Sequence, residues 1–147
     1  TKLKNNIGLL TLIFIEYVKF VAKYYLFKMK THPANEKLTE LITLASKKGT
    51  TSKKLIEGLK DLRAIALLEQ DPLVTKVLRL AYEFLEENDD FSVEAQYEED
   101  EEGNEYPLEI PSEENLAYLL TLLKKADHKI NREEIKDYRT ALKTELY

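Results

Sequence analysis

The sequence of 147 residues is long enough for one domain with a substantial hydrophobic core. It contains no cysteine, which excludes disulfides, a thiol nucleophile and thiolate metal sites and favours a reducing, cytoplasmic environment. Four glycines, four prolines and 33% charged residues favour compact helical structure over a sandwich of strands.

Charge is distributed unevenly along the chain. Residues 86–114 hold 14 of the 27 acidic residues and no Lys or Arg, whereas the remaining residues carry 13 acids and 22 bases. A basic body therefore carries an acidic insertion. This asymmetry does not identify a function, but it favours interaction with charged partners.

Residues 7–27 are largely apolar, and their only charges are Glu16, Lys19 and Lys23. A membrane-spanning helix needs about 20 predominantly apolar residues, and a signal peptide needs a small-residue cleavage site; neither pattern is complete here. Because the three charges fall on one helical face, we favour a helix over residues 1–30 whose broad apolar surface is buried by the domain or by a partner. Left uncovered, such a surface would favour self-association or contact with a membrane surface; of these, membrane contact is not expected.

The N-terminal helix is expected to end near Lys30, because the residue before Pro33 is pushed out of helical geometry. The apolar spacing predicts three further helices within residues 35–88. Asp71 and Pro72 are typical of a helix start, with an acidic N-cap followed by proline at the first helical position. The helix that they begin has a wide apolar face, which predicts a central position.

Two more helices are expected within residues 113–146. Asn131 is predicted to cap the second of them, with Glu134 reaching back to it. Ile130 is predicted to pack on Ile135 as a hydrophobic staple.

Between these groups of helices, residues 91–110 show the alternation of an acidic β-hairpin. Gly103-Asn104 supplies the turn, and Pro107 requires an edge position. The strands are expected to present one apolar face to the helices; an unstructured acidic loop is the alternative. The predicted fold is mainly α: a single-domain, compact bundle of about six helices with one short β-hairpin between the fourth and fifth.

The hairpin tip is the leading candidate for function. It combines six carboxylates with two tyrosines, a combination suited to a basic protein partner, so the predicted partner-binding residues are Tyr97, Glu98, Glu99, Asp100, Glu101, Glu102, Glu105 and Tyr106. One alternative is an acidic surface loop without a partner. Another is a hairpin that folds back on the basic helices and masks them.

Residues 41–58 resemble the helix-turn-helix family, with Ala45, Gly49 and Leu55 at the spacing of its small contact residue, its turn glycine and an apolar residue of its second helix. The resemblance implies a nucleic-acid-binding regulator that uses residues 38–63. Its phosphate contacts would come from Lys47, Lys48, Lys53, Lys54, Lys60 and Arg63. The pattern departs from the family at three positions where apolar residues are usual: Lys48, Thr50 and Gly58.

No catalytic residue, metal site or cofactor is predicted, and we expect a non-enzymatic protein. Neither His32 nor His128 has a partner at the spacing of a metal pair or a catalytic triad. Residues 127–135 resemble the second half of an EF-hand loop, but Leu123 and Lys125 occupy the positions of the first ligands. A helix cap accounts for the same residues.

Overall fold

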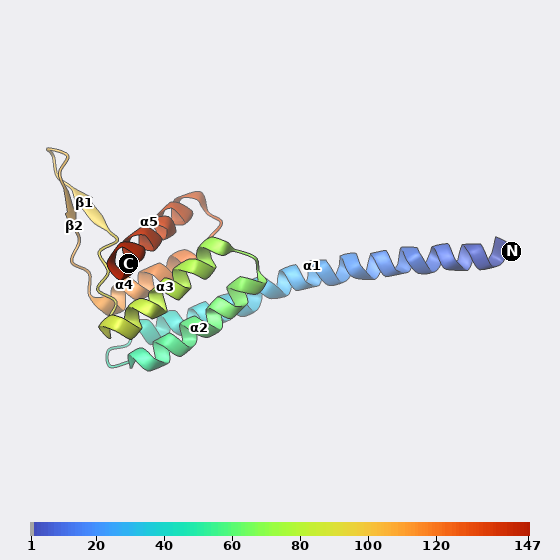
Figure 1. The fold of residues 1–147 in the computed structure, drawn as a ribbon, viewed down its shortest axis with the longest axis horizontal. Coiled ribbons are helices and arrows are strands. Elements are labelled where there is room, and N and C mark those ends of the chain that lie inside the picture. Colours follow the sequence, from blue (N-terminus) through green and yellow to red (C-terminus); the bar gives the residue numbers. More distant parts are fainter. Residues whose placement is uncertain (1) are drawn as a thin grey trace.

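The computed structural model describes residues 2–147, with side chains described for residues 6–22 and 34–147 (Figure 1). Its elements in chain order are α1 (Lys2–Ser46), α2 (Ser52–Leu68), α3 (Pro72–Asn88), β1 (Tyr97–Glu99), β2 (Glu105–Pro107), α4 (Ser112–Leu123) and α5 (Lys129–Leu146). The predicted mainly α bundle is confirmed, and so is the short antiparallel hairpin in the connection that follows the 72–88 helix.

The break predicted at Pro33 is absent. The helix expected over residues 1–30 and the first of the three expected within residues 35–88 form one continuous helix of 45 residues. A proline removes one hydrogen bond from a helix and disfavours helical geometry at the preceding residue, but it does not forbid either neighbour from being helical. Helix-forming sequence on both sides of Pro33 outweighs that local cost.

The core lies between four helices and the last part of α1. Residues 34–46 of α1 pack on α2 and α4, while α3 packs on α2 and α5. The central position predicted for α3 is confirmed, because Val77, Leu78, Leu80 and Ala81 are fully buried. Asp71 caps this helix as predicted by accepting the Val74 N–H at 3.3 Å, with Pro72 at its first turn.

The helices α1 and α2 run antiparallel and approach each other closely at Gly58 (Figure 1). A Cβ atom at this buried position would lie 2.1 Å from Cδ2 of Leu41, whose side chain is itself buried in the core. A larger residue at position 58 would therefore require the buried Leu41 side chain to move.

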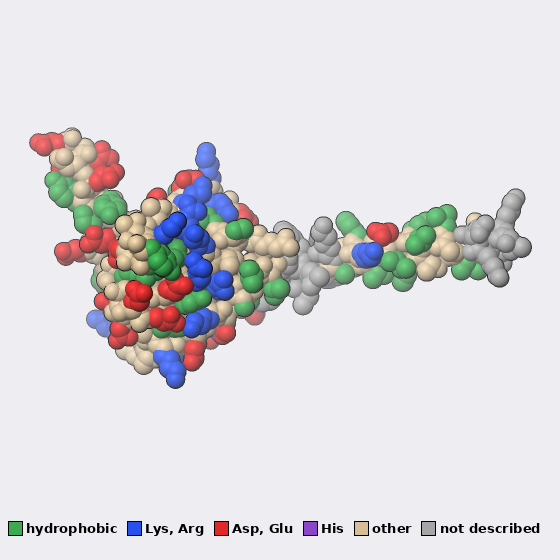
Figure 2. Space-filling model, viewed as in Figure 1, with side chains coloured by type: hydrophobic (Ala, Val, Ile, Leu, Met, Phe, Trp, Pro, Cys, Tyr) green, Lys and Arg blue, Asp and Glu red, His purple; other side chains and the backbone are tan. Residues whose placement is uncertain are grey.

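The N-terminal part of α1, residues 7–22, leaves the bundle as a single helix, which we call the apolar arm (Figures 1 and 2). The bundle does not cover it: the exposed fraction is 42–70% for Ile7, Leu9, Leu10, Leu12, Ile13, Phe14, Ile15, Tyr17, Val18 and Phe20. Burial of this helix by the rest of the domain, one of its two expected environments, is therefore not observed. Among the described residues, no helix is both long enough and apolar enough to cross a membrane.

The start of α5 differs from its prediction. The helix begins at Lys129 after His128, whose side chain makes no capping hydrogen bond. Asn131 instead donates from Nδ2 to the Leu122 carbonyl at 3.4 Å, and Ile130 is 64% exposed. The amide of Asn131 thus ties α5 to the end of α4, which leaves neither a capping box nor a hydrophobic staple.

Candidate protein-interaction site

The acidic hairpin projects from one end of the bundle (Figure 1). Its ladder pairs Tyr97 with Pro107, Glu98 with Tyr106 and Glu99 with Glu105. The paired segment is shorter and farther from the helices than predicted, and it presents no apolar face to them, since Tyr97 and Tyr106 are 53% and 55% exposed. The hairpin is held in place by the segment before it, which contacts the core, and not by its strands. A ladder of three residue pairs is therefore long enough to form it.

The hairpin turn is organised by one carboxylate. Asp100 Oδ1 accepts the backbone N–H groups of Glu102 at 2.9 Å and Asn104 at 2.8 Å, and Oδ2 accepts Asn104 Nδ2 at 3.0 Å. The bonds from Asn104 are the main reason that the pKa of Asp100 lies below its ordinary value. Gly103 has a φ of +84°, which the turn requires and glycine supplies at little cost.

All eight predicted partner-binding residues lie together on this projection, and all are exposed. Five of them belong to the strands, and Asp100 builds the turn, so the tip has more structural order than a charged loop. The five are Tyr97, Glu98, Glu99, Glu105 and Tyr106. Figure 2 shows acidic side chains gathered at the tip and basic ones in a band over the bundle. Among the described residues, no Lys or Arg forms an ion pair with the tip, and the alternative of a hairpin folded back on the basic helices is not seen (Figure 1).

The segment before the hairpin anchors it to the core. Phe91 and Val93 are buried, as their alternation predicted. The Phe91 ring meets Phe84 edge-on at 5.8 Å and stacks on Tyr138 at 6.4 Å between centroids. These contacts fix where the chain leaves the bundle, and hence where the hairpin stands.

A buried polar cluster holds the same segment in place. Asn115 on α4 donates from Nδ2 to the carbonyls of Phe91 at 3.1 Å and Val93 at 2.9 Å, and its Oδ1 accepts the hydroxyl of Tyr138 at 2.6 Å. Gln96, the last residue before β1, donates to the same hydroxyl oxygen at 2.8 Å. Burial raises the pKa of Tyr138 to about 12, so the hydroxyl stays protonated at neutral pH and can donate.

Sequence reasoning missed Asn115 and Gln96. The only signal for Asn115 is a polar residue beside the apolar positions of α4, and such a residue is as easily assigned to the solvent face. Its partners come from positions 91, 93 and 138, which no local pattern connects.

The basic residues of the nucleic-acid alternative divide into two groups. Four are exposed around the α1–α2 connection: Lys47, Lys48, Lys53 and Lys54. Lys60 pairs with Glu86 at 2.9 Å, and Arg63 lies farther along α2. Because α2 runs back alongside α1, the pair is arranged as an antiparallel helical hairpin, whereas helix-turn-helix units cross at a large angle (Figure 1). Nucleic-acid binding by residues 38–63 stays a prediction.

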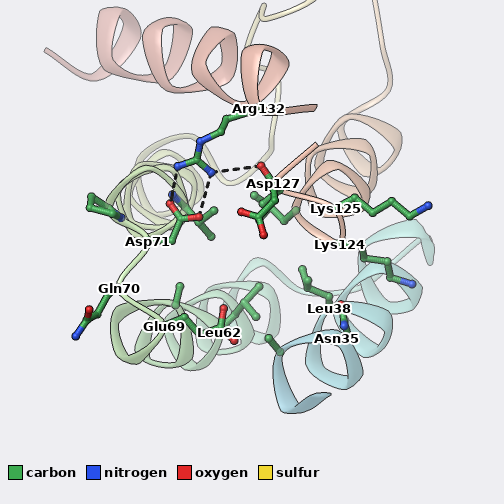
Figure 3. Close-up of a pocket in the computed structure, with 16 residues that line it drawn as sticks. Asn35, Leu38, Leu62, Glu69, Gln70, Asp71, Lys124, Lys125, Asp127 and Arg132 are labelled. Atoms are coloured by element: carbon green, nitrogen blue, oxygen red, sulfur yellow. Dashed lines mark hydrogen bonds and ion pairs between the residues drawn. The ribbon is translucent and has the colours of Figure 1, made fainter. Parts of the chain in front are cut away.

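A hollow of about 430 Å³ lies where α1, α2 and the α4–α5 connection meet (Figure 3). Arg132 reaches into it and donates to both oxygens of Asp71 at 3.1 Å, and also to the Ala126 carbonyl at 3.3 Å. Burial raises the pKa of Asp71, but the bonds from Arg132 and Val74 outweigh this, so that the net pKa lies below its ordinary value. These two charged groups satisfy each other, so the pair stabilises the junction rather than presenting a free charge.

The residues considered for catalysis or metal binding do not converge. Within the part of the chain that the structure describes, no three His, Asp or Glu side chains come together as a metal site would need. Glu134, in the segment 127–135 that resembles part of an EF-hand loop, accepts a hydrogen bond from the hydroxyl of Tyr118. This bond raises the pKa of Tyr118 to about 12. The side chain of His32 lies outside the described residues.

No protein-family model, no curated protein and no solved structure matches this chain. The class of the protein is therefore given by its fold, a helical bundle that carries an ordered acidic hairpin at one end and an apolar helical arm at the other.

Proposed function

We propose that the protein is a non-enzymatic interaction domain with a regulatory role, which binds a basic protein partner through its hairpin. One observation carries this proposal: six carboxylates stand on an ordered projection that the bundle anchors but does not contact or neutralise.

The two kinds of side chain on the hairpin support different parts of recognition. Exposed ion pairs contribute only about 0–1 kcal/mol each, so the carboxylates serve mainly to attract and orient a basic surface. Tyr97 and Tyr106 lie beside them, half exposed, and tyrosine supplies contact area at low entropic cost.

Photo-crosslinking in the source cells tests the proposal, with the reactive residue in place of Tyr97. The hairpin variant is E98Q/E101Q/E102Q, and the matched control E57Q/E87Q/D137N removes three exposed charges from the helices. The wild type and the control should capture the same basic partner, and the hairpin variant should lose it. Purified, that partner should bind less tightly as salt rises. Equal capture by all three chains would refute the proposal.

A second candidate function is self-association through the apolar arm. Residues Ile7, Leu10, Phe14, Tyr17 and Val21 follow the alternating spacing of three and four that brings side chains onto one seam of a coiled coil. The opposite face carries Glu16 and Lys19, which pair at 3.4 Å. An exposed, largely apolar helix whose charges Glu16 and Lys19 lie away from this seam fits a second copy of itself.

A further inference from the structure

A cationic groove of about 510 Å³ lies between the C-terminal part of α2 and the first turns of α3. Three basic side chains line it: Arg63, Lys76 and Arg79. The one acidic residue in its lining, Asp71, is already bound through both oxygens by Arg132. The lining itself therefore has a net positive charge, of which Glu83, outside the lining, offsets part at Arg79.

Two hydrogen-bond donors in this lining are without acceptors. The Nε atoms of Arg63 and Arg79 are buried, and neither makes a hydrogen bond. Arg79 Nε lies 3.6 Å from Glu83 Oε1, which is close enough for an ion pair but too long for a hydrogen bond. Lys76 makes no ion pair with any described residue. Buried donors without acceptors are rare in folded proteins, and here two occur on residues that line the same groove.

A carboxylate is the ligand that fits the guanidinium groups of Arg63 and Arg79. Guanidinium groups bind carboxylates through parallel N–H bonds, and such charge-assisted bonds are stronger than neutral ones. The groove also has an apolar wall, formed by Pro72 and by Leu67, which is 59% exposed. A ligand that joins carboxylates to an apolar ring would satisfy both surfaces.

The hairpin tip has this chemistry, since its carboxylates flank Tyr97 and Tyr106. It stands at one end of the bundle, while the groove lies at the other end, beside the point where the arm leaves (Figure 1). The tip cannot reach the groove of its own chain. We infer that the groove receives the hairpin tip of a second copy of the chain. This inference rests on the proposed function, and it identifies the basic partner of the hairpin as another molecule of the same protein.

Cysteine crosslinking tests the contact in the full chain, because the natural sequence has no cysteine. A chain with E101C at the tip is mixed with a chain carrying L67C in the groove, and a short bismaleimide is added. The mixed crosslink should form at low salt and fall by about tenfold or more when the L67C chain also carries R63Q/R79Q. The matched control, T43C, places an exposed cysteine on α1 away from the groove and should crosslink poorly.

The single variant K76E tests the groove with a substitution that should leave the fold intact, because Lys76 makes no ion pair among the described residues. It should lower the crosslink yield while the melting temperature stays unchanged. Equal yields with T43C and L67C, or yields that R63Q/R79Q and K76E leave unaltered, would overturn the inference. If the cysteine crosslink fails but the hairpin variant still loses a different basic partner in cells, the proposed function stands and only the tip–groove contact is refuted. If the cysteine crosslink fails and the hairpin variant loses no partner, both the contact and the proposed function are refuted.

Discussion

Asn115 connects three parts of the chain that lie far apart in the sequence. Its amide binds two carbonyls of the segment before the hairpin, and its oxygen binds Tyr138 on α5. A buried amide with one missing partner costs more free energy than a satisfied one contributes, so the cluster permits only one placement of the segment. At the scale of residues, the hairpin owes its position to this side chain.

The hydroxyl of Tyr138 is expected to stabilise the protein at neutral pH and not at high pH. Y138F loses the bonds to Asn115 and Gln96 and should lower the free energy of unfolding by about 1–2 kcal/mol. In the wild type, the raised pKa of about 12 means that stability falls as pH rises from about 10, where the unfolded tyrosine ionises, toward 12.

Urea unfolding at pH 8 and pH 11 measures this effect. The difference between the wild type and Y138F should narrow at the higher pH, because the variant has no such group to titrate. Y97F, which alters an exposed tyrosine of the hairpin, controls for the chemistry of the substitution. A difference that stays constant between the two pH values would contradict the assignment.

At the scale of elements, the α1–α2 contact depends on the absence of a side chain at Gly58. G58A should lower the free energy of unfolding by about 1–3 kcal/mol, because its Cβ would overlap the buried Leu41. This loss outweighs the gain in helix propensity of about 1 kcal/mol. In the background of L41A, which removes the clashing atoms, G58A should cost much less; additive losses in a double-mutant cycle would show that the overlap is not the cause.

The sequence allowed good prediction of those elements whose signals are local. The Asp71-Pro72 start of α3, the apolar face of that helix and the inward Phe91 and Val93 were all evident from spacing. Other features required knowledge of the environment. Pro33 disfavours a helix without preventing it, and Asn131 could cap α5 or bind the Leu122 carbonyl, a choice that depends on where α4 ends.

The candidate site was predictable in composition but not in geometry. The charge run and the turn residues located the hairpin, whereas its projection depends on Asn115 and Tyr138, whose partners are distant in sequence. The groove between α2 and α3 was not foreseen, because Lys76 and Arg79 read as solvent-facing residues of α3 until α2 is placed beside them.

At the scale of the whole molecule, the apolar arm and the bundle are expected to behave independently. L10Q/F14Q changes two residues of the apolar seam and should shift the chain toward the monomer at high salt, where contacts between charged surfaces are screened. The matched control L12Q/I15Q alters two other exposed residues of the arm, on the face of Glu16 and Lys19, and should leave association unchanged.

Sedimentation velocity measures the association, and thermal unfolding measures the bundle. Neither pair should change the free energy of unfolding of the bundle by more than about 0.5 kcal/mol, since the arm residues are exposed. If both double variants reduce association equally, or if neither reduces it, self-association through the apolar seam is refuted.

The hairpin and the groove lie at opposite ends of the bundle, and this sets the geometry of any assembly that joins them. Two copies joined tip to groove still have one unused tip and one unused groove, so the contact is heterologous and a third copy can add in the same way. Such an assembly grows in one direction and has no fixed number of subunits. Unless it closes into a ring, its length is governed by concentration and ionic strength.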